Sequence, residues 1–385
     1  MRSYPTCAKL LTSVTRIGLW LPLLFAAFEV VRLQAEELAV RYEASHRAMG
    51  TVFSVVAYGR DARYLAQVAN EAFEEIDRLD AQVSNYRPES ELAGINRLAA
   101  RQAVIVEPQL FQLIRDALVY SEETGGAFDI TVGPLMKAWG FFRGQGRLPS
   151  PSELRQVLKR IGYRRVKPDQ DRRTIRFAAE GMELDLGGIA KGYAVDEAVE
   201  ILRANGVASA LVSSGTSSLY ALGAPPEERA WKITLRDPYD AEKVGNVVYL
   251  KNYSLSASGS YEKFFQLAGR TYCHILDPRT GRPVENMLAT AVLAPRAVQS
   301  DALSTAFFVL DVGGSLKYLA THGNLSVLFY QPAGAPPDFK RVWLRSVSFT
   351  LPPESLAEFA SAGRLTAAGP PGAPLPIHSD LSGPL

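Results

Sequence analysis

The chain has 385 residues, and 47% of them are hydrophobic, which is enough to build a substantial core in one large domain or two. Lys and Arg number 42 against 40 Asp and Glu, so the composition has no basic surplus of the kind that binds nucleic acid. Only Cys7 and Cys273 occur, which excludes a disulfide framework and a cysteine-based zinc site.

The N-terminus, residues 1–35, is expected to be a signal peptide or an N-terminal anchor. Basic residues precede an apolar run at Ile17 to Phe28, and Leu33-Gln34-Ala35 is typical of a cleavage site. The run is shorter than the ~20 residues that a membrane-spanning helix needs, which favours a cleaved signal over an uncleaved anchor. Both alternatives predict an exported protein, either periplasmic or associated with the inner membrane on its extracytoplasmic side.

Amphipathic helices are predicted where apolar residues recur at intervals of three and four. Pro108 is suited to the start of one of them, and Ser150 with Glu153 forms a capping-box pattern at the start of another. Gly162 and Gly206 provide stops. The predicted helices cover residues 65–79, 108–118, 151–161 and 189–204.

Strands are predicted at Thr51 to Tyr58 and then mainly in the second half of the chain. The later runs are short, apolar or alternating, and bounded by turn residues; they lie at residues 210–212, 231–235, 247–250, 271–276, 290–293 and 325–330. Because helices gather early and strands late, we expect an α+β domain over residues 40–350 and not a regular βαβ array. Residues 366–385 are rich in Pro, Gly and Ala and are expected to be a disordered tail.

Asp301 and Thr305 stand four residues apart at the start of a further predicted helix. Residues at this spacing share one helix face, so a carboxylate and a hydroxyl could bind one hard cation. An Asp early in a helix also interacts favourably with the helix dipole, and that alternative stays open.

The run DLGGIAKG at Asp185 to Gly192 places glycines before a predicted helix. Free N–H groups at such a start bind anions, and Lys191 adds a positive charge. A tight strand-to-helix turn with a solvated lysine is the competing interpretation.

His274 lies in HILDPRTG, the only Gly-, Pro- and Asp-rich turn that contains one of the four histidines. A histidine there can act as a base near neutral pH, although a structural histidine and an ordinary turn at Asp277 are the alternatives. Tyr86, Phe128 and Trp139 could stack on a planar ring or fill the core.

Seven motifs occur in an order that strongly resembles the FAD:protein FMN transferase (ApbE) family. The resemblance spans roughly Arg47 to Tyr330. Its motifs are HRAMGT from His46, SNYRPESELAGIN from Ser84, TGGAFDITVGPLMKAWGF from Thr124, DLGGIAKGYAVD from Asp185, SASGSYEKFF from Ser256, HILDPRTGRPV from His274 and SDALSTAFFVL from Ser300.

The resemblance implies a single, T-fold-like flavin transferase domain that moves FMN from FAD to a Thr or Ser hydroxyl of a target protein and releases AMP. It implies Mg²⁺ bound by Asp301, Thr305 and the carbonyl of Gly188. It gives His274 as the general base, which Asp277 could orient or replace. The positions that it matches to FAD contacts are Met49, Tyr86, Ala127, Phe128, Asp129, Asp185, Lys191, His274 and Ile275.

The expected partners are FAD and an acceptor protein, a membrane or extracytoplasmic redox protein, since the chain itself carries no convincing acceptor motif. One segment departs from the family pattern: Ser213 to Gly223 reads SSGTSSLYALG where many relatives carry Gly-Gly-Asp or Gly-Gly-Asn. Two alternatives to transfer remain, hydrolysis of FAD to FMN and AMP and flavin binding without turnover.

Overall fold

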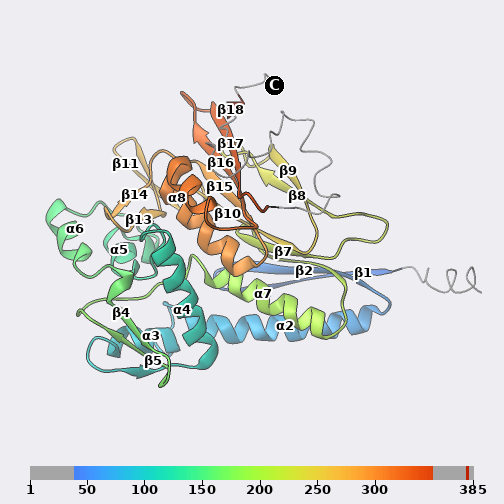
Figure 1. The fold of residues 1–385 in the computed structure, drawn as a ribbon, viewed down its shortest axis with the longest axis horizontal. Helices are drawn as coiled ribbons and strands as arrows, with labels where there is room; N and C mark the ends of the chain where they lie inside the picture. Colours follow the sequence, from blue (N-terminus) through green and yellow to red (C-terminus); the bar gives the residue numbers. More distant parts are fainter. Residues whose placement is uncertain (1–38, 350–378, 381–385) are drawn as a thin grey trace, which may run out of the picture.

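The computed structural model describes residues 39–349 and 379–380, and its main feature is a nine-stranded antiparallel sheet (Figure 1). Every neighbouring pair in this sheet is antiparallel. In spatial order the strands are β1 (Val40–Ala48), β2 (Thr51–Gly59), β6 (Ser209–Ser214), β7 (Ser218–Leu222), β10 (Tyr253–Gly259), β15 (Ala289–Ala294), β16 (Ser326–Pro332), β17 (Phe339–Arg345) and β18 (Ser379–Asp380).

Strands β1 and β2 form a hairpin closed by the two residues Met49 and Gly50. Both have positive φ, 49° and 72°, which is the geometry of a type I′ turn and matches the right-handed twist of the strands. A positive φ is uncommon for a residue with a side chain, and such residues gather at functional sites. The turn therefore marks the Met49 end of the hairpin as a place to examine for binding.

Three long helices cover one face of the sheet: α2 (Ala62–Val83), α7 (Ala190–Ala204) and α8 (Ala297–Leu319). Apolar residues of α2 and α7 form one core cluster with the inner residues of β2, β6 and β7. Helix α8 lies along β10 and β15 and breaks at Asp311, whose φ is 62°. The helical layer fixes where the first turns of α7 and α8 meet.

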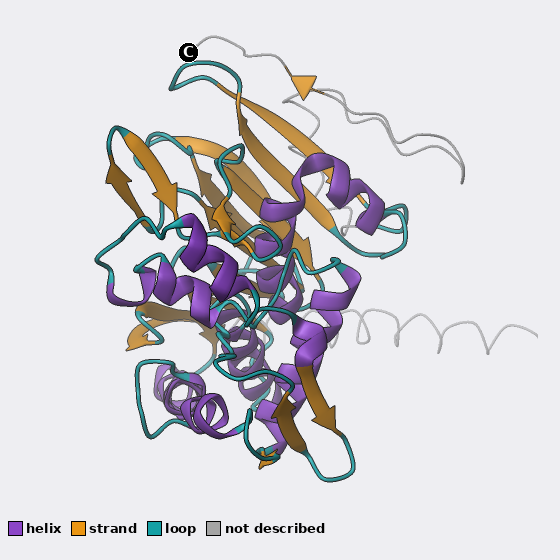
Figure 2. Cartoon of the chain, turned by 90° about the vertical axis from the view of Figure 1, so that its left-hand side faces the viewer, coloured by secondary structure: helices purple, strands orange, loops and turns teal. Residues whose placement is uncertain are grey.

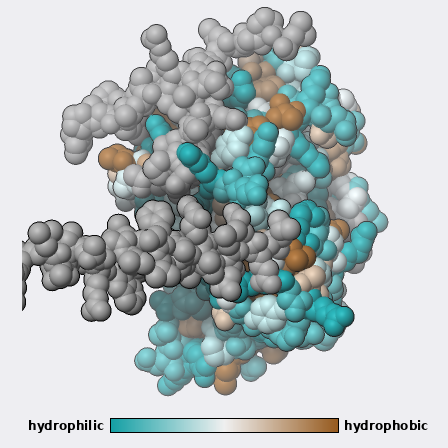
Figure 3. All heavy atoms as spheres, turned by 90° about the vertical axis from the view of Figure 1, so that its right-hand side faces the viewer, coloured by the Kyte–Doolittle hydropathy of each residue, from teal (hydrophilic) through white to brown (hydrophobic). Residues whose placement is uncertain are grey.

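The opposite face of the sheet is covered by a separate hairpin, β8 (Trp231–Arg236) and β9 (Val244–Leu250). Trp231 and Val248 belong to a core cluster with Leu293 and Leu328 of the sheet. All six residues of β15 are buried, as expected for a strand that is covered on both faces. The face of the molecule in Figure 3 is mostly hydrophilic where described residues are visible, with scattered hydrophobic residues.

A second group of short elements lies beside the sheet, on the left in Figure 1. Figure 2 faces this side of the molecule and shows helices next to short strands. The group contains α3 (Glu91–Leu98), β3 (Val104–Ile105), α4 (Pro108–Glu123), α5 (Gly133–Ala138), η1 (Phe141–Arg143), α6 (Pro151–Leu158), η2 (Tyr163–Arg165), β4 (Val166–Asp169), β5 (Thr174–Phe177) and the hairpins β11 (Phe264–Leu267) with β12 (Arg270–Cys273) and β13 (Leu276–Asp277) with β14 (Arg282–Pro283). The short strands form small sheets of their own, β11 with β12, β13 with β14, and β3 with β5 and β4.

Comparison with the expectations confirms the α+β class and the four amphipathic helices. Ser150 caps α6 by accepting a hydrogen bond from the N–H of Glu153 at 3.2 Å, as the capping-box pattern predicts. Helices α3 and α5, the sheet strands β1, β7, β10 and β17, and the short strands β3, β4, β5, β11 and β14 were not predicted. The predicted strand at 271–276 is divided between β12 and β13. No helix of the described residues is long and apolar enough to span a bilayer.

The predicted signal or anchor at 1–35 and the predicted tail at 366–385 lie outside the described residues, apart from the short strand Ser379–Asp380.

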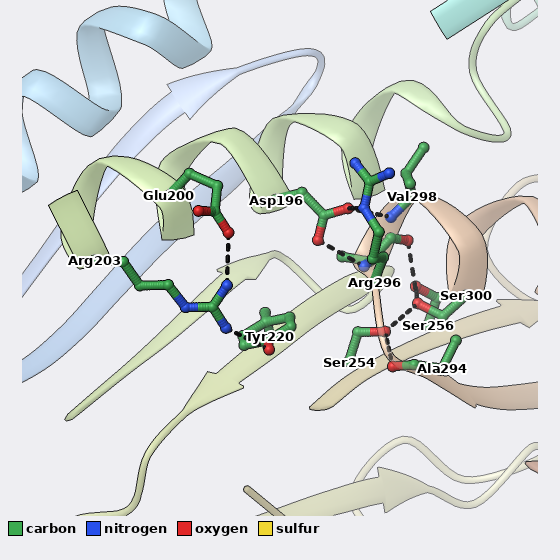
Figure 4. Close-up of polar contacts among 11 residues, drawn as sticks. Asp196, Glu200, Arg203, Tyr220, Ser254, Ser256, Ala294, Arg296, Val298 and Ser300 are labelled. Atoms are coloured by element: carbon green, nitrogen blue, oxygen red, sulfur yellow. Dashed lines mark hydrogen bonds and ion pairs between the residues drawn. The ribbon is translucent and has the colours of Figure 1, made fainter. Parts of the chain in front are cut away.

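Helices α7 and α8 cross in very close contact at Gly192. A Cβ at this position would lie 2.2 Å from the carbonyl oxygen of Ala297 and 2.6 Å from the Cβ of Asp301. Four residues further along α7, the buried Asp196 accepts hydrogen bonds from the N–H groups of Ala297 and Val298, at 2.7 and 3.0 Å. Figure 4 shows Asp196 reaching the start of α8 beside Arg296. The first turn of α8 is therefore held against the first turns of α7.

Replacement Gly192→Ala should lower the free energy of unfolding by about 1–3 kcal/mol, because the added methyl group must push the two helices apart. The matched control is Gly94→Ala in α3, where a Cβ would meet only the end of Arg97 at 3.9 Å. The control should be neutral or stabilising by up to about 1 kcal/mol, since alanine is the better helix former. Urea unfolding followed by circular dichroism compares the two; equal midpoints would contradict the close crossing.

Candidate functional site

Asp301 and Thr305 lie one turn apart on α8 and face the start of α7. Asp301 is only 3% exposed, and its Oδ2 accepts a hydrogen bond from the backbone N–H of Gly192 at 2.8 Å. Thr305 is partly exposed while the four residues before it are buried, so its side chain lies at the edge of the core. The carboxylate of Asp301 is thus anchored by one of its two oxygens.

Gly188 completes this group from the turn that precedes α7. A Cβ at Gly188 would lie 3.4 Å from Thr305 Oγ1 and 3.2 Å from the ring of Phe128. The absence of a side chain lets the backbone approach the hydroxyl of α8. The structure therefore brings Gly188, which the family resemblance implies as a metal ligand, close to Thr305, which shares a helix face with Asp301.

The oxygen donors at this place suit a hard cation such as Mg²⁺, which prefers carboxylate, hydroxyl and carbonyl oxygens. Among residues 39–349 and 379–380, no group of three His, Cys, Asp or Glu side chains could hold a metal ion. A site at Gly188 would therefore depend on one carboxylate, one hydroxyl and the backbone, leaving room for oxygens of a bound ligand. The residues present fit such a cation.

The turn before α7 is stabilised by its own polar residues. Asp185 Oδ1 accepts a hydrogen bond from the N–H of Gly187 at 2.8 Å, and Lys191 Nζ donates one to the carbonyl of Gly187 at 3.0 Å. The N–H of Asp185 donates to the carbonyl of Ile130 at 2.7 Å, which ties the turn to the segment after Phe128. Lys191 thus keeps its positive charge beside the N-terminus of α7, where the helix dipole also favours an anion.

His274 lies between β12 and β13, and both its ring and its backbone contact the carbonyl of Lys263. The distance from Nδ1 to this oxygen is 3.0 Å, and the backbone N–H donates to the same oxygen at 2.9 Å. Because a carbonyl only accepts, Nδ1 carries the proton and Nε2 is left with its lone pair. The pKa of His274 is lowered to about 4, mainly by burial and to a smaller extent by the nearby charges of Lys263 and Lys191, while the hydrogen bond to Lys263 opposes the shift.

Asp277 lies three residues beyond His274, but its carboxylate is bound elsewhere. Its two oxygens form a bidentate pair with the guanidinium of Arg279, at 2.8 and 3.0 Å. Asp277 was expected to be able to orient His274. In the structure, the carbonyl of Lys263 orients the imidazole instead. To act as a base itself, Asp277 would have to leave Arg279.

The segment Ala127 to Asp129 is buried next to Gly188. Asp129 Oδ1 accepts from the N–H and the hydroxyl of Thr131, and Oδ2 accepts from the N–H of Tyr163 at 2.9 Å. Burial raises the pKa of Asp129, while these bonds oppose the increase. Its carboxylate is thus used within the fold, and contact with a ligand here is open to the backbone and to Phe128.

Tyr86 lies beside a cavity of about 170 Å³ through its contact with Phe142, which lines the cavity together with Asp185 of the glycine turn. Its ring stacks on Phe142 with 4.7 Å between centroids and 13° between planes, although 68% of Tyr86 is exposed. Burial of its hydroxyl and the nearby charge of Asp185 raise the pKa of Tyr86. The residues that line the cavity include Asn85, Asn96, Arg97, Lys137, Phe142, Glu183 and Asp185.

Met49 and Ile275, two further residues suggested for FAD, are placed by the core. Met49 is partly buried and packs against two of the core clusters. Ile275 is buried, and its carbonyl accepts a hydrogen bond from Val284. The turn Ser214 to Ser218 within the unusual SSGTSS segment lies against the same hairpin, since a Cβ at Gly215 would be 2.5 Å from Thr51 Oγ1.

Two features of the site were not predicted. The first is Phe142, which directly follows the motif that ends at Phe141. Its stacking with Tyr86 depends on the 3₁₀ turn η1, and the pattern of apolar residues does not predict this turn. The carbonyl of Lys263 orients His274, and a backbone atom leaves no signal in the residue type.

The family model of ApbE matches residues 49–329. The FAD:protein FMN transferase of Treponema pallidum (strain Nichols) is 33% identical over 307 residues, covering 76% of this chain and 84% of that protein. The protein of the same name from Salmonella typhimurium is 30% identical and covers 72% and 81%, respectively.

Two solved structures are also similar to this chain in fold and sequence. The ApbE protein of Thermotoga maritima has a TM-score of 0.71 at 31% identity, covering 80% of this chain and 97% of its own. The apo form of Pseudomonas stutzeri flavinyl transferase ApbE has a TM-score of 0.69 at 30% identity, with 77% and 92% covered. The sequence and fold matches therefore place the protein among the flavin transferases. The chain belongs to the ApbE family.

The protonation state of His274 can be measured directly. At pH 7 long-range ¹H–¹⁵N correlation spectra should show a neutral imidazole with the proton on Nδ1, and the resonance should titrate near pH 4. An unfolded histidine titrates near 6.5, so between these values the unfolded chain binds more protons and His274 costs stability as the pH falls. An Nε2-protonated tautomer of His274 would contradict the hydrogen bond to Lys263. The spectrum of His46, which contacts Asp77 through Nε2 and not through Nδ1, serves as the comparison in the same sample.

Proposed function

We propose that the protein is a Mg²⁺-dependent FAD:protein FMN transferase that attaches FMN to a Thr or Ser hydroxyl of another protein and releases AMP. The observation that carries this proposal is the meeting of the glycine turn at Gly188 with Asp301 and Thr305 of α8. Family membership supports the overall reaction, and the geometry supports the roles of the individual residues.

Mg²⁺ would be held by the carbonyl of Gly188, the carboxylate of Asp301 and the hydroxyl of Thr305. When bound, it would supply positive charge to the diphosphate of FAD. The protein adds the charge of Lys191 and the N-terminus of α7 on the same side. In transfers of phosphoryl type, most of the catalytic effect comes from such positioning and charge stabilisation.

The neutral His274 accepts the proton in this scheme. The acceptor oxygen forms a bond to the phosphorus of the FMN half, the bond from this phosphorus to the oxygen of the AMP half breaks, and the hydroxyl proton moves to Nε2. AMP carries away the electron pair of the broken bond. Because the proton on Nδ1 is bound to the carbonyl of Lys263, Nε2 is the nitrogen that has a free lone pair.

The FAD contacts proposed from the family pattern lie around this centre. Tyr86 and Phe142 offer a stacked aromatic surface at the cavity that Asp185 lines. Phe128 of the segment Ala127 to Asp129 lies against Gly188. Met49 and Ile275 would contribute apolar contacts.

We also propose that the acceptor is a membrane or extracytoplasmic redox protein and that this chain acts outside the cytoplasm. This proposal rests on the basic and apolar leader of residues 1–35 and on its cleavage-site pattern.

Replacement Asp301→Ala should reduce FMN transfer by roughly 100-fold or more, above the loss typical of removing an outer-shell partner of a metal. The reaction mixture would hold FAD, Mg²⁺ and an acceptor protein, with the intact mass of the acceptor and released AMP as readouts. Asp171→Ala, in an exposed turn, serves as the matched carboxylate control and should transfer normally.

The products also separate the alternatives. Free FMN and AMP with an unmodified acceptor would favour hydrolysis, and no AMP with any acceptor would favour binding without turnover. Full transfer by Asp301→Ala would contradict the proposed metal site.

A further inference from the structure

A row of buried hydroxyl groups joins β10 to α8 and ends at Thr305. The side chains of Ser254, Ser256 and Ser258 alternate along β10, and each contacts a serine of α8. Figure 4 shows the part of this row that lies nearest the start of α8, where Ser254 and Ser256 contact Ser300. All of these serines are buried. Such groups in an apolar layer need partners, so the direction of each hydrogen bond can be worked out.

Each hydroxyl has one proton to donate, so the direction of the hydrogen bonds between Ser304, Ser258 and Thr305 can be derived by starting from Ser304. Ser304 Oγ is 2.9 Å from the carbonyl oxygen of Asp301, which only accepts, so the single proton of Ser304 is used there. Ser304 Oγ is also 2.8 Å from Ser258 Oγ, and this bond must therefore use the proton of Ser258.

Ser258 then has only lone pairs to offer to its second neighbour, Thr305. The distance between Ser258 Oγ and Thr305 Oγ1 is 3.5 Å, longer than the 2.5–3.0 Å of ordinary O–H···O bonds, but only Thr305 can be the donor in this contact. When the Thr305 hydroxyl makes this long contact, its proton points toward β10. Its lone pairs are left for the side on which Gly188 lies.

We propose that Ser258 and Ser304 are positioning residues that hold the Thr305 hydroxyl with its oxygen lone pairs toward the cation site. The inference rests on the proposed function, since it assigns to Thr305 the role of a metal ligand. Removal of Ser258 would let the Thr305 hydroxyl rotate. Removal of Ser304 would free the proton of Ser258, which could then donate to Thr305 and compete with the cation for its lone pairs.

The test measures metal binding apart from catalysis, with the whole chain, FAD and Mn²⁺ as a paramagnetic substitute for Mg²⁺. Electron paramagnetic resonance counts free Mn²⁺ in a titration of each variant. Ser258→Ala should bind Mn²⁺ about tenfold more weakly, the lower end of the loss caused by removing outer-shell partners. The matched control Ser254→Ala removes a buried hydroxyl from the same face of β10 but should stay within about twofold of the unmodified protein.

A double-mutant cycle separates positioning from general damage. In a Thr305→Val background, Ser258→Ala should cause no further loss of Mn²⁺ affinity, because the hydroxyl that it orients is gone. Equal weakening by Ser254→Ala, unchanged binding by Ser258→Ala, or additive losses in the double variant would each overturn the inference. Ser304→Ala interrupts the same row and replaces Ser258→Ala if that variant does not fold.

The outcome is independent of the transferase assay. A protein that binds Mn²⁺ with the predicted pattern but never modifies an acceptor would refute the proposed function and support the role of Ser258. A protein that transfers FMN while Ser258→Ala and Ser254→Ala bind Mn²⁺ alike would refute the role of Ser258 alone.

Discussion

The reciprocal contact between the first turns of α7 and α8 is the constraint on which the candidate site depends. Gly192 of α7 donates its N–H to Asp301 of α8, and Asp196 of α7 accepts the N–H groups of Ala297 and Val298. Each helix thus satisfies backbone groups or side chains at the start of the other, where an isolated helix has unpaired N–H groups. The crossing tolerates no Cβ at Gly192, so it also fixes the distance between Gly188 and Thr305. Fold stability and site geometry therefore share the same contacts.

How much of this could be predicted depends on whether the signal is local. The long helices follow from apolar spacing, as for Leu65 to Leu79, and the capping of α6 follows from Ser150 and Glu153. Strand β1 has a weak alternation, because Tyr42, Ala44 and His46 on its inner face are only half-buried. Its hairpin turn also lacks the usual Asn-Gly. It gains its strand conformation from pairing with β2, which is a nonlocal interaction.

The site shows the same division. Asp301 and Thr305 could be related by spacing, but their approach to Gly188, over a hundred residues earlier, was available only from the family resemblance and is now described by the fold. The role of Asp129 could not be read from its residue type, because its carboxylate is used by Thr131 and Tyr163 within the fold. Orientation by a backbone carbonyl, as at Lys263, escapes any pattern of residue types.

The low pKa of His274 determines which step of the proposed reaction needs most stabilisation from the rest of the site. A histidine with a pKa of about 4 is almost fully neutral at pH 7, so its lone pair is always available, but it is a weaker base than one that titrates near neutrality. Such a base gives little help in removing a proton from the acceptor hydroxyl before the new bond forms. In the proposed reaction, the transfer must then rely on the other side, where Lys191, the start of α7 and a cation that Asp301 and Thr305 would hold would stabilise negative charge on the phosphates. The desolvation that keeps His274 neutral, with a smaller contribution from Lys263 and Lys191, thus leaves the positive charge of Lys191 as the protein's own cationic contribution to the phosphate side.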